Sequence, residues 1–261
     1  MGRRGPEFEE YADRYPHIAM ERTEGVLQMR LHSEGRSLAF GIAVHEELGY
    51  AFADIADDVG NEVVILTGTG GAFCDSFDTT GIEDVTPQVF DDLMYHGRRL
   101  IENYLSIDVP VIAAVNGPVR FHSELAILAD VVLASDDATF QDGSHFTNGV
   151  VPGDGHHPFW THALGWNRGR YFLITGQVLD AMTAREYGVV NEVLPPQRLL
   201  ERAHALAREI AQKPRLVRQY TRRLFTHELK RLSHQDLSMG FALEGMGQLD
   251  SWDASTLVAS D

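Results

Sequence analysis

Three short runs of consecutive apolar residues, each set among loops and helical stretches, most constrain the fold of this chain. Val63 to Thr67 leads into Gly68-Thr69-Gly70-Gly71, and Pro110 to Val115 leads into Asn116-Gly117. A third run, Asp130 to Ser135, follows a short helical stretch. Continuous apolar runs of this length are typical of strands buried on both faces of a parallel sheet. The repeated order of strand, loop and helix predicts an α/β fold.

Helical periodicity fills the segments between these runs. Gly41 to Asp58 repeats apolar residues at three- and four-residue steps, which places His45 on the apolar face of a predicted helix. Thr86-Pro87 has the residue types expected at the N-cap and first position of the next helix. Ser123 to Leu128 predicts a shorter helix, and Val26 to Leu31 predicts an early strand whose residues alternate between polar and apolar.

The last quarter of the chain changes to amphipathic helices. Leu199 to Gln212 and Arg215 to Leu229 are separated by Lys213-Pro214, and Leu237 to Gln248 is a third candidate. We therefore predict a core domain over residues 1–198 and a helical C-terminal extension over residues 199–261. Amphipathic helices of this kind often form contacts between subunits.

The net charge of the chain limits the classes of partner that it is expected to bind. The 261 residues carry a formal net charge of −16, which disfavours binding to nucleic acid or to anionic membranes. No apolar run approaches the roughly 20 residues that span a bilayer, and the N-terminus lacks the apolar segment of a secretory signal. Cys74 is the only cysteine, so no intrachain disulfide forms. These features predict a cytoplasmic protein.

Three segments together resemble the crotonase (enoyl-CoA hydratase/isomerase) superfamily. They are Val63 to Cys74, Pro110 to Gly117, and Leu173 to Leu194 with its Gly188-Val189-Val190 turn. The resemblance implies a crotonase-type spiral of ββα turns with a helical C-terminal oligomerisation extension. It also implies a homotrimer or a dimer of trimers.

The chain departs from typical members at the positions that serve thioester chemistry. Relatives carry a glycine-rich stretch after the Asn-Gly whose backbone N–H helps to bind the thioester enolate, whereas Pro118 to Glu124 contains no glycine. Ser144 stands where the hydratase glutamate would align, with His145 beside it. Residues 37–97 contain no Lys or Arg to pair with the phosphates of coenzyme A. The departures argue against an acyl-CoA substrate.

The same departures resemble the 6-oxocamphor hydrolase branch of β-diketone hydrolases. This resemblance implies hydrolysis of a C–C bond in a cyclic or bicyclic β-diketone (a retro-Claisen reaction) to a keto acid, with no cofactor and no metal. The branch carries an indole donor where this chain has Phe40, which provides a wall but no hydrogen bond. The matching catalytic positions are His45, His122, His145, Asp154 and Glu244, and the expected substrate-binding residues are Phe40, Phe121 and Ile82.

The chemistry assigns a task to each of these side chains. Water needs a general base with a pKa near the working pH, and we predict His145 as that base with Asp154 as its orienting acid. His122 is the expected donor to the oxyanion. His45 orients the substrate or protonates the enolate, and Glu244 holds the attacking water.

Each assignment has a structural alternative. His45 on an apolar face is often a packed core residue, Asp154 between glycines is often a turn residue, and Glu244 is often a solvated helical acid. His156 and His157 are expected to be loop residues. A divalent metal on the histidines and Asp154 matches no local ligand pattern. The alternative functions are an acyl-CoA hydratase or isomerase and a catalytically silent crotonase-fold binding protein.

Overall fold

The computed structural model describes residues 5–81 and 86–251. Its strands are β1 Ile18–Thr23, β2 Val26–Leu31, β3 Ala39–Phe40, β4 Val63–Thr67, β5 Ser76–Phe77, β6 Val111–Val115, β7 Val131–Ser135, β8 Thr139–Phe140, β9 Leu179–Asp180 and β10 Glu192–Leu194. Its helices are α1 Phe8–Tyr11, α2 Ile42–Asp57, α3 Pro87–Ser106, α4 Glu124–Ile127, α5 His156–Leu164, α6 Trp166–Thr175, α7 Ala181–Glu186, α8 Pro196–Ala211, α9 Arg215–Leu232 and α10 Ser238–Ser251.

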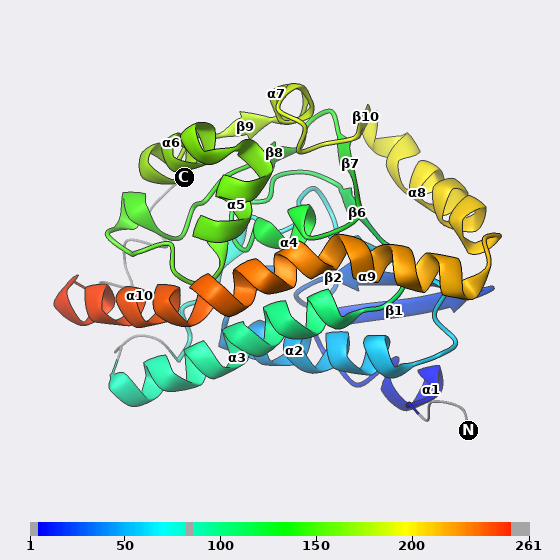
Figure 1. The fold of residues 1–261 in the computed structure, drawn as a ribbon, viewed down its shortest axis with the longest axis horizontal. Helices are drawn as coiled ribbons and strands as arrows, with labels where there is room; N and C mark the ends of the chain where they lie inside the picture. Colours follow the sequence, from blue (N-terminus) through cyan, green and yellow to red (C-terminus); the bar gives the residue numbers. More distant parts are fainter. Residues whose placement is uncertain (1–4, 82–85, 252–261) are drawn as a thin grey trace.

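A six-stranded sheet in the order β1-β2-β4-β6-β7-β10 forms the centre of the molecule (Figure 1). All neighbouring pairs are parallel except β1 and β2, which form an antiparallel hairpin. The predicted α/β fold with a parallel sheet is therefore confirmed. Strand β1 was not predicted. It is joined to β2 through Glu24 and Gly25, whose φ angles of 50° and 78° suit a tight two-residue turn.

Both faces of the central sheet are covered by helices. Residues of β4 such as Val64 and Leu66 belong to the core that packs against α2 and α3, whereas Val63 and Ile65 pack against α8. The predicted strand Val26 to Leu31 is confirmed as β2, and α8 covers part of its polar face. Gln28 of β2 is buried under α8, where its Oε1 lies 2.8 Å from Nε2 of His204.

A second layer of short strands lies beside the main sheet. β3 pairs with β5 in parallel, β8 pairs with β9 antiparallel, and single bridges join Cys74 to Val119 and Val119 to Phe140. The chain thus passes from a main strand to a short outer strand and then to a helix, which is the predicted ββα spiral. The loops after these outer strands carry the polar side chains described below.

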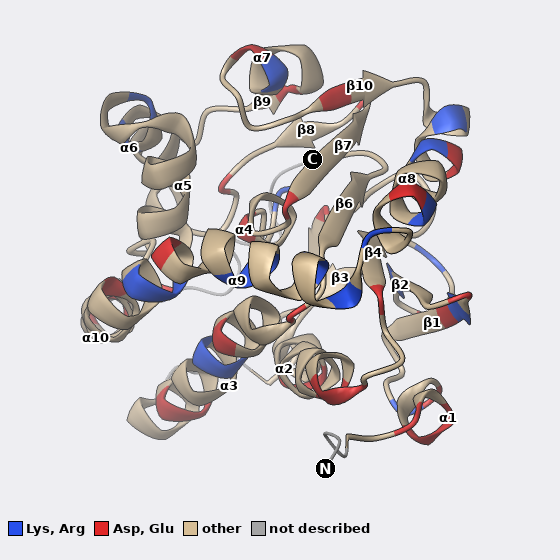
Figure 2. Cartoon of the chain, turned by 45° about the vertical axis from the view of Figure 1, so that its right-hand side comes forward, with Lys and Arg blue, Asp and Glu red and all other residues tan. Residues whose placement is uncertain are grey.

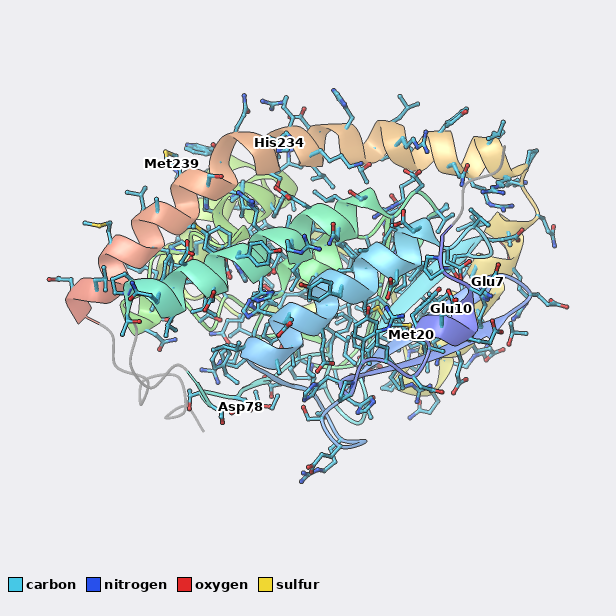
Figure 3. The ribbon with its side chains drawn as sticks, turned by 90° about the horizontal axis from the view of Figure 1, so that it is seen from below. Glu7, Glu10, Met20, Asp78, His234 and Met239 are labelled. Carbon is cyan, nitrogen blue, oxygen red and sulfur yellow. The ribbon has the colours of Figure 1, made fainter. Side chains whose placement is uncertain are left out.

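The C-terminal helices form one long arm that lies across α3 (Figures 1 and 3). The predicted break at Lys213-Pro214 is present, and α9 continues through a π-helical turn, Ser233–Leu237, into α10. Both α9 and α10 contact α3. Met239, labelled in Figure 3, lies on the outer side of α10 with 56% of its surface exposed. Since α8 packs on the main sheet, the domain boundary at residue 198 stays a prediction.

The surface carries the acidic excess seen in the sequence. In Figure 2, α2 bears acidic side chains and no basic ones. Across the described ranges, no helix combines the length and the apolar character needed to cross a membrane. The cytoplasmic location stays a prediction.

Candidate active site

A cavity opens between α2, α3, α10 and the loops that precede α4 and α5. Its apolar walls come mainly from aromatic and aliphatic side chains, whereas its polar side is formed largely by imidazoles and carboxylates. None of the described residues that line it is Lys or Arg. The lining residues are His45, Phe77, Phe90, Leu93, His122, Ser144, His145, Val150, Asp154, Phe241, Glu244 and Gln248.

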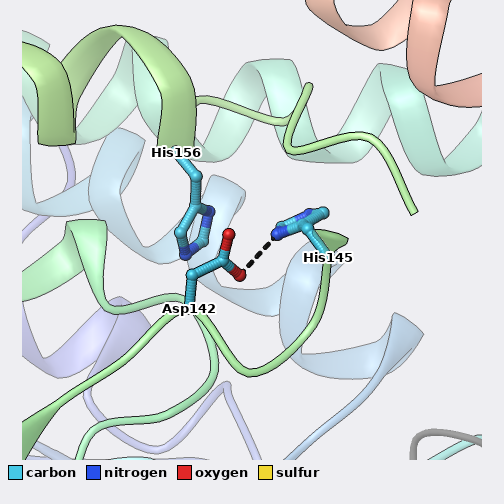
Figure 4. A group of neighbouring side chains, drawn as sticks. All are labelled: Asp142, His145 and His156. Atoms are coloured by element: carbon cyan, nitrogen blue, oxygen red, sulfur yellow. Dashed lines mark hydrogen bonds and ion pairs between the residues drawn. The ribbon is translucent and has the colours of Figure 1, made fainter. Parts of the chain in front are cut away.

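His145 lies between two carboxylates. Its Nδ1 is 2.7 Å from Oδ1 of Asp142, and its Nε2 is 3.4 Å from Oδ1 of Asp154. Burial alone would lower the pKa of His145, but the two carboxylates outweigh it and hold that pKa well above the ordinary value. Figure 4 shows Asp142 between His145 and His156. The orienting acid on Nδ1 is therefore Asp142, and the predicted orienting role of Asp154 is revised: it faces the other ring nitrogen.

His156 is the first residue of α5 and has no exposed surface. Its Nδ1 lies 2.9 Å from Oδ1 of Asp154, and its Nε2 lies 3.2 Å from Oε2 of Glu124. Burial lowers its pKa, but the charges of Glu124 and Asp154 prevail and raise it to about 9. The expectation that His156 and His157 are loop residues is therefore wrong, since both lie in α5.

Asp154 is shared between these two imidazoles. Burial raises its pKa, yet the charges of His145 and His156 prevail and hold it well below the ordinary value. The preceding residue explains how the loop reaches α10. A Cβ on Gly153 would lie 2.2 Å from the carbonyl oxygen of Gly240, so only glycine permits this approach.

His122 reaches the cavity from an unusual backbone conformation. Its φ of 48° lies in the left-handed region, where the backbone of residues other than glycine is strained. Its Nδ1 is 2.7 Å from Oε1 of Glu124, a fully buried residue at the start of α4. Its Nε2 lies 4.0 Å from Oδ2 of Asp154. We call these six side chains the histidine–carboxylate cluster: His122, Glu124, Asp142, His145, Asp154 and His156.

His45 and Phe40 pack against His122. The Phe40 ring stacks on the His122 ring at 3.9 Å with an interplanar angle of 23°, and the His45 ring meets His122 edge-on at 4.5 Å. Burial, with the neighbouring His122, holds the pKa of His45 well below its ordinary value, so that ring is neutral. Its Nδ1 has no hydrogen-bond partner among the described residues.

Glu244 of α10 also lines the cavity, with a carboxylate oxygen within 4.8 Å of one of Asp154. Burial and the charge of Asp154 raise the pKa of Glu244 to about 8. Gln248 Nε2 donates to its Oε1 at 3.2 Å, and its Oε2 has no hydrogen-bond partner in the described ranges. At neutral pH this side chain is a carboxylic acid facing the cavity.

Comparisons with known proteins agree with this fold. The sequence profile of the enoyl-CoA hydratase/isomerase family matches residues 21–244. The chain belongs to this family. A probable enoyl-CoA hydratase of Mycobacterium bovis is 29% identical over 245 residues, covering 89% of this chain and 94% of its own length. An enoyl-CoA hydratase/isomerase structure from Mycobacterium paratuberculosis, 23% identical, covers 89% of this chain and 93% of its own with a TM-score of 0.83.

One solved structure shares much more sequence. It is a β-diketone hydrolase from the cyanobacterium Anabaena, bound to (S)-3-oxocyclohexyl acetic acid. It is 44% identical, and the match covers 92% of the present chain and 97% of the hydrolase chain with a TM-score of 0.91. The predicted resemblance to the crotonase superfamily is thus confirmed, with a β-diketone hydrolase among the similar structures.

The fold brings the five predicted catalytic side chains to one cavity. His45, His122, His145, Asp154 and Glu244 all line it. Phe40 and Phe121 are almost fully buried and lie outside its lining. Ile82 lies outside the described residues. Whether these three residues contact substrate stays a prediction.

Three members of the histidine–carboxylate cluster were missed as site residues. Asp142 and Glu124 were not considered, and His156 was placed in a loop. Each of them lies within three residues of another cluster member in the sequence. An acid and a histidine two or three residues apart are the signal that could have identified them.

Two groups in the site have spacings that suit a cation. The ligand atoms of Asp142, His145 and His156 lie within 4.8 Å of one another, as do those of His145, Asp154 and Glu244. In this structure the Nδ1 atoms of His145 and His156 already face Asp142 and Asp154 at hydrogen-bond distance. The absence of a metal from the reaction stays a prediction.

Proposed function

We propose that this crotonase-family enzyme hydrolyses a C–C bond of a cyclic or bicyclic β-diketone to give a keto acid. The observation that carries the proposal is the joint placement of His122, His145, Asp154 and Glu244 around an apolar cavity. The 44% identical β-diketone hydrolase supports it, because the molecule bound there is itself a keto acid.

The first step is the activation of water. The pair His145 and Asp154 accepts a proton from water while the oxygen attacks one carbonyl of the substrate. The carboxylates raise the pKa of His145, so the pair must lose a proton before it can accept one. Activity should therefore increase with pH on the acidic side of the profile.

The second step is cleavage of the C–C bond. An N–H of His122 donates to the oxyanion of the tetrahedral intermediate. The bond to the central carbon then breaks, and its electron pair moves into the second carbonyl to form an enolate. Neutral His45, with an unpartnered Nδ1, orients that carbonyl.

The third step is protonation of the enolate carbon. Glu244, protonated at neutral pH, is a better donor than neutral His45. The pair His145 and Asp154 then returns its proton to Glu244, since the ligand atoms of the three side chains lie within 4.8 Å. The net reaction of the three steps is the addition of one water molecule to the substrate. The new carboxylic acid then ionises in solution.

The cavity also suits the substrate class. Phe77, Phe90 and Phe241 provide walls for an alicyclic skeleton. Burying phosphates beside Asp154 would be unfavourable without a Lys or Arg to pair with them, and none of the described lining residues is of either type. An acyl-CoA substrate is therefore the weaker alternative.

The test is a screen of cyclic and bicyclic 1,3-diketones for formation of a keto acid, detected by mass as the addition of water and by acid release. His145→Ala is the matched inactive variant. Crotonyl-CoA is offered in parallel, with calorimetry for binding. The proposal would be overturned if the enzyme turned over no diketone and either hydrated crotonyl-CoA or bound it with a Kd of about 10 μM.

We also propose that the chain assembles as a homotrimer or a dimer of trimers. Leu224 and Phe225 of α9 are 75% and 63% exposed, which is unusual for large apolar side chains of an isolated subunit. Light scattering should give at least three times the chain mass of 29.1 kDa. A monomer at micromolar concentration would contradict the assembly.

A further inference from the structure

The histidine–carboxylate cluster is one line of alternating acids and imidazoles. His145 sits between Asp142 and Asp154, and His156 sits between Asp154 and Glu124. The line ends on His122. Its successive separations are 2.7 Å, 3.4 Å, 2.9 Å, 3.2 Å and 2.7 Å, from Asp142 through His145, Asp154, His156 and Glu124 to His122.

We propose that Glu124 and His156 are positioning residues that fix where the protons of the cavity histidines, His122 and His145, reside. Neither Glu124 nor His156 lines the cavity, and neither has exposed surface. They connect the His122 side of the site to the His145 side. The inference rests on the proposed function only in its kinetic test.

Glu124 fixes which ring nitrogen of His122 faces the cavity. Its Oε1 accepts the Nδ1–H of His122, so Nε2 is the ring nitrogen left for the cavity and for Asp154. In a neutral ring this Nε2 would be a bare acceptor and could not donate to an oxyanion. Which ring nitrogen of His122 faces the cavity therefore depends on the Nδ1 contact with Glu124, whose side chain is fully buried.

His156 acts as a fixed cation between the two acids. Its Nδ1–H donates to Asp154, whose Oδ1 thereby serves His156 and His145 together. The contact with Glu124 Oε2 is electrostatic, because that oxygen makes no aligned hydrogen bond in the described ranges and Ser123 Oγ lies 3.4 Å from the same nitrogen. The raised pKa of His156, about 9, agrees with a permanent charge.

The charges around the cluster balance. Three carboxylates face three imidazoles, so a cluster with all six groups ionised is neutral. The further titratable groups that face it are His45 of α2, His157 of α5, Cys74 beside Glu124, and Glu244 of α10. Burial leaves each of these four neutral at pH 7, since the pKa values of Cys74 and Glu244 are raised and those of His45 and His157 are lowered.

The first test needs no substrate. Nitrogen NMR of ¹⁵N-histidine-labelled protein should show both ring nitrogens of His156 protonated between about pH 6 and 8. In Glu124→Gln, an isosteric change, the ring-nitrogen signals of His122 should shift, because the carboxylate that faces its Nδ1 is gone. His204→Gln is the matched control, because the His204 Nε2 contacts Gln28 under α8, away from the cluster. A neutral His156 in the unmodified enzyme would overturn the inference, even where a variant fails to fold.

The second test is kinetic. Glu124→Gln and His156→Gln should each lower kcat by about tenfold or more, with KM changed by less than about twofold, and should move the pH–rate profile. Glu124→Asp keeps the charge and should recover part of the loss. An unchanged kcat and pH profile in folded Glu124→Gln would show that Glu124 only fills space. If the unmodified enzyme cleaves no diketone, the proposed function fails while the NMR result still decides this inference.

Discussion

Strand β4 and the histidine–carboxylate cluster are both buried, and burial acts on them in opposite directions. Every residue of β4 is buried and apolar or hydrogen-bonded, so its removal from water stabilises the fold. In the cluster, burial opposes the charged state of Asp142, His145, Asp154 and His156, and only their mutual contacts offset it. Burial therefore stabilises the sheet directly, whereas the charged cluster is stable only while its partners remain.

The largest effect is expected from breaking the cluster at its centre. His145→Ala should lower kcat on a cleaved diketone by roughly 10² to 10⁴, the span of a positioned base. Asp154→Asn should be comparably severe, because the amide cannot carry the charge that pairs with His145 and His156. Steady-state kinetics on both single variants and the double variant measure this.

The double variant tests whether the two residues act as one unit. Both serve one proton transfer, so the double variant should be little worse than His145→Ala alone. Independent multiplication of the two losses would contradict the assignment. So would near-normal turnover by His145→Ala.

A substitution that leaves a cavity in the central sheet should lower the free energy of unfolding and leave kcat unchanged. Leu66 of β4 is fully buried between Met29 and Ala113 of the neighbouring strands. Leu66→Ala should lower the free energy of unfolding by about 2–5 kcal/mol, by an amount that does not vary with pH. Urea denaturation at several pH values measures it. A large loss of kcat in the folded variant at low temperature would contradict the separation between sheet and cluster.

The same contrast explains what the sequence could predict. The strands β4, β6 and β7 follow from apolar runs, because burial of an apolar side chain depends on little beyond its own chemistry. Strand β1 was not predicted, because it is a hairpin strand exposed on one side. Strand β2 was predicted with its correct bounds, but its sequence does not show that α8 covers the polar face.

The candidate site was predictable only in part. The resemblance supplied the five residues that face the cavity, but not the contacts behind them. Each histidine of the cluster has an acid two or three residues away, as in His122 with Glu124 and Asp142 with His145. These local pairs are visible in the sequence. The contacts between pairs, such as Asp154 with His145, depend on the loop packing and are not.

A smaller effect is expected in the pH dependence of stability. Glu244 has a pKa of about 8 in the folded protein against an ordinary 4.5. Between these values the folded protein keeps a proton that the unfolded chain loses, so this stabilisation is complete below pH 4.5 and is lost as pH rises to 8. His156 acts in the same direction between 6.5 and about 9.

Glu244→Gln should therefore flatten the decline in urea midpoint between about pH 5 and 8, and should leave the His156 contribution in place. Glu46→Gln, at an exposed position of α2, is the matched control and should leave the decline unchanged. A parallel decline in Glu244→Gln and the unmodified protein would show that Glu244 is ionised in the fold.

The smallest effect is expected where the apolar core meets the cluster. Phe40 is fully buried and its ring stacks on His122, while Glu124 holds the same imidazole through a hydrogen bond. Phe40→Leu removes the stacking, worth about 1 kcal/mol for an aromatic pair, and leaves the hydrogen bond. We expect kcat to decrease by less than about tenfold and the pH–rate profile to keep its position.

Phe121→Leu is the matched control, since Phe121 is equally buried but packs on Phe77. A hundredfold loss in Phe40→Leu alone would mean that stacking, and not Glu124, fixes the orientation of His122, and the boundary between core and cluster would have to be redrawn to include Phe40.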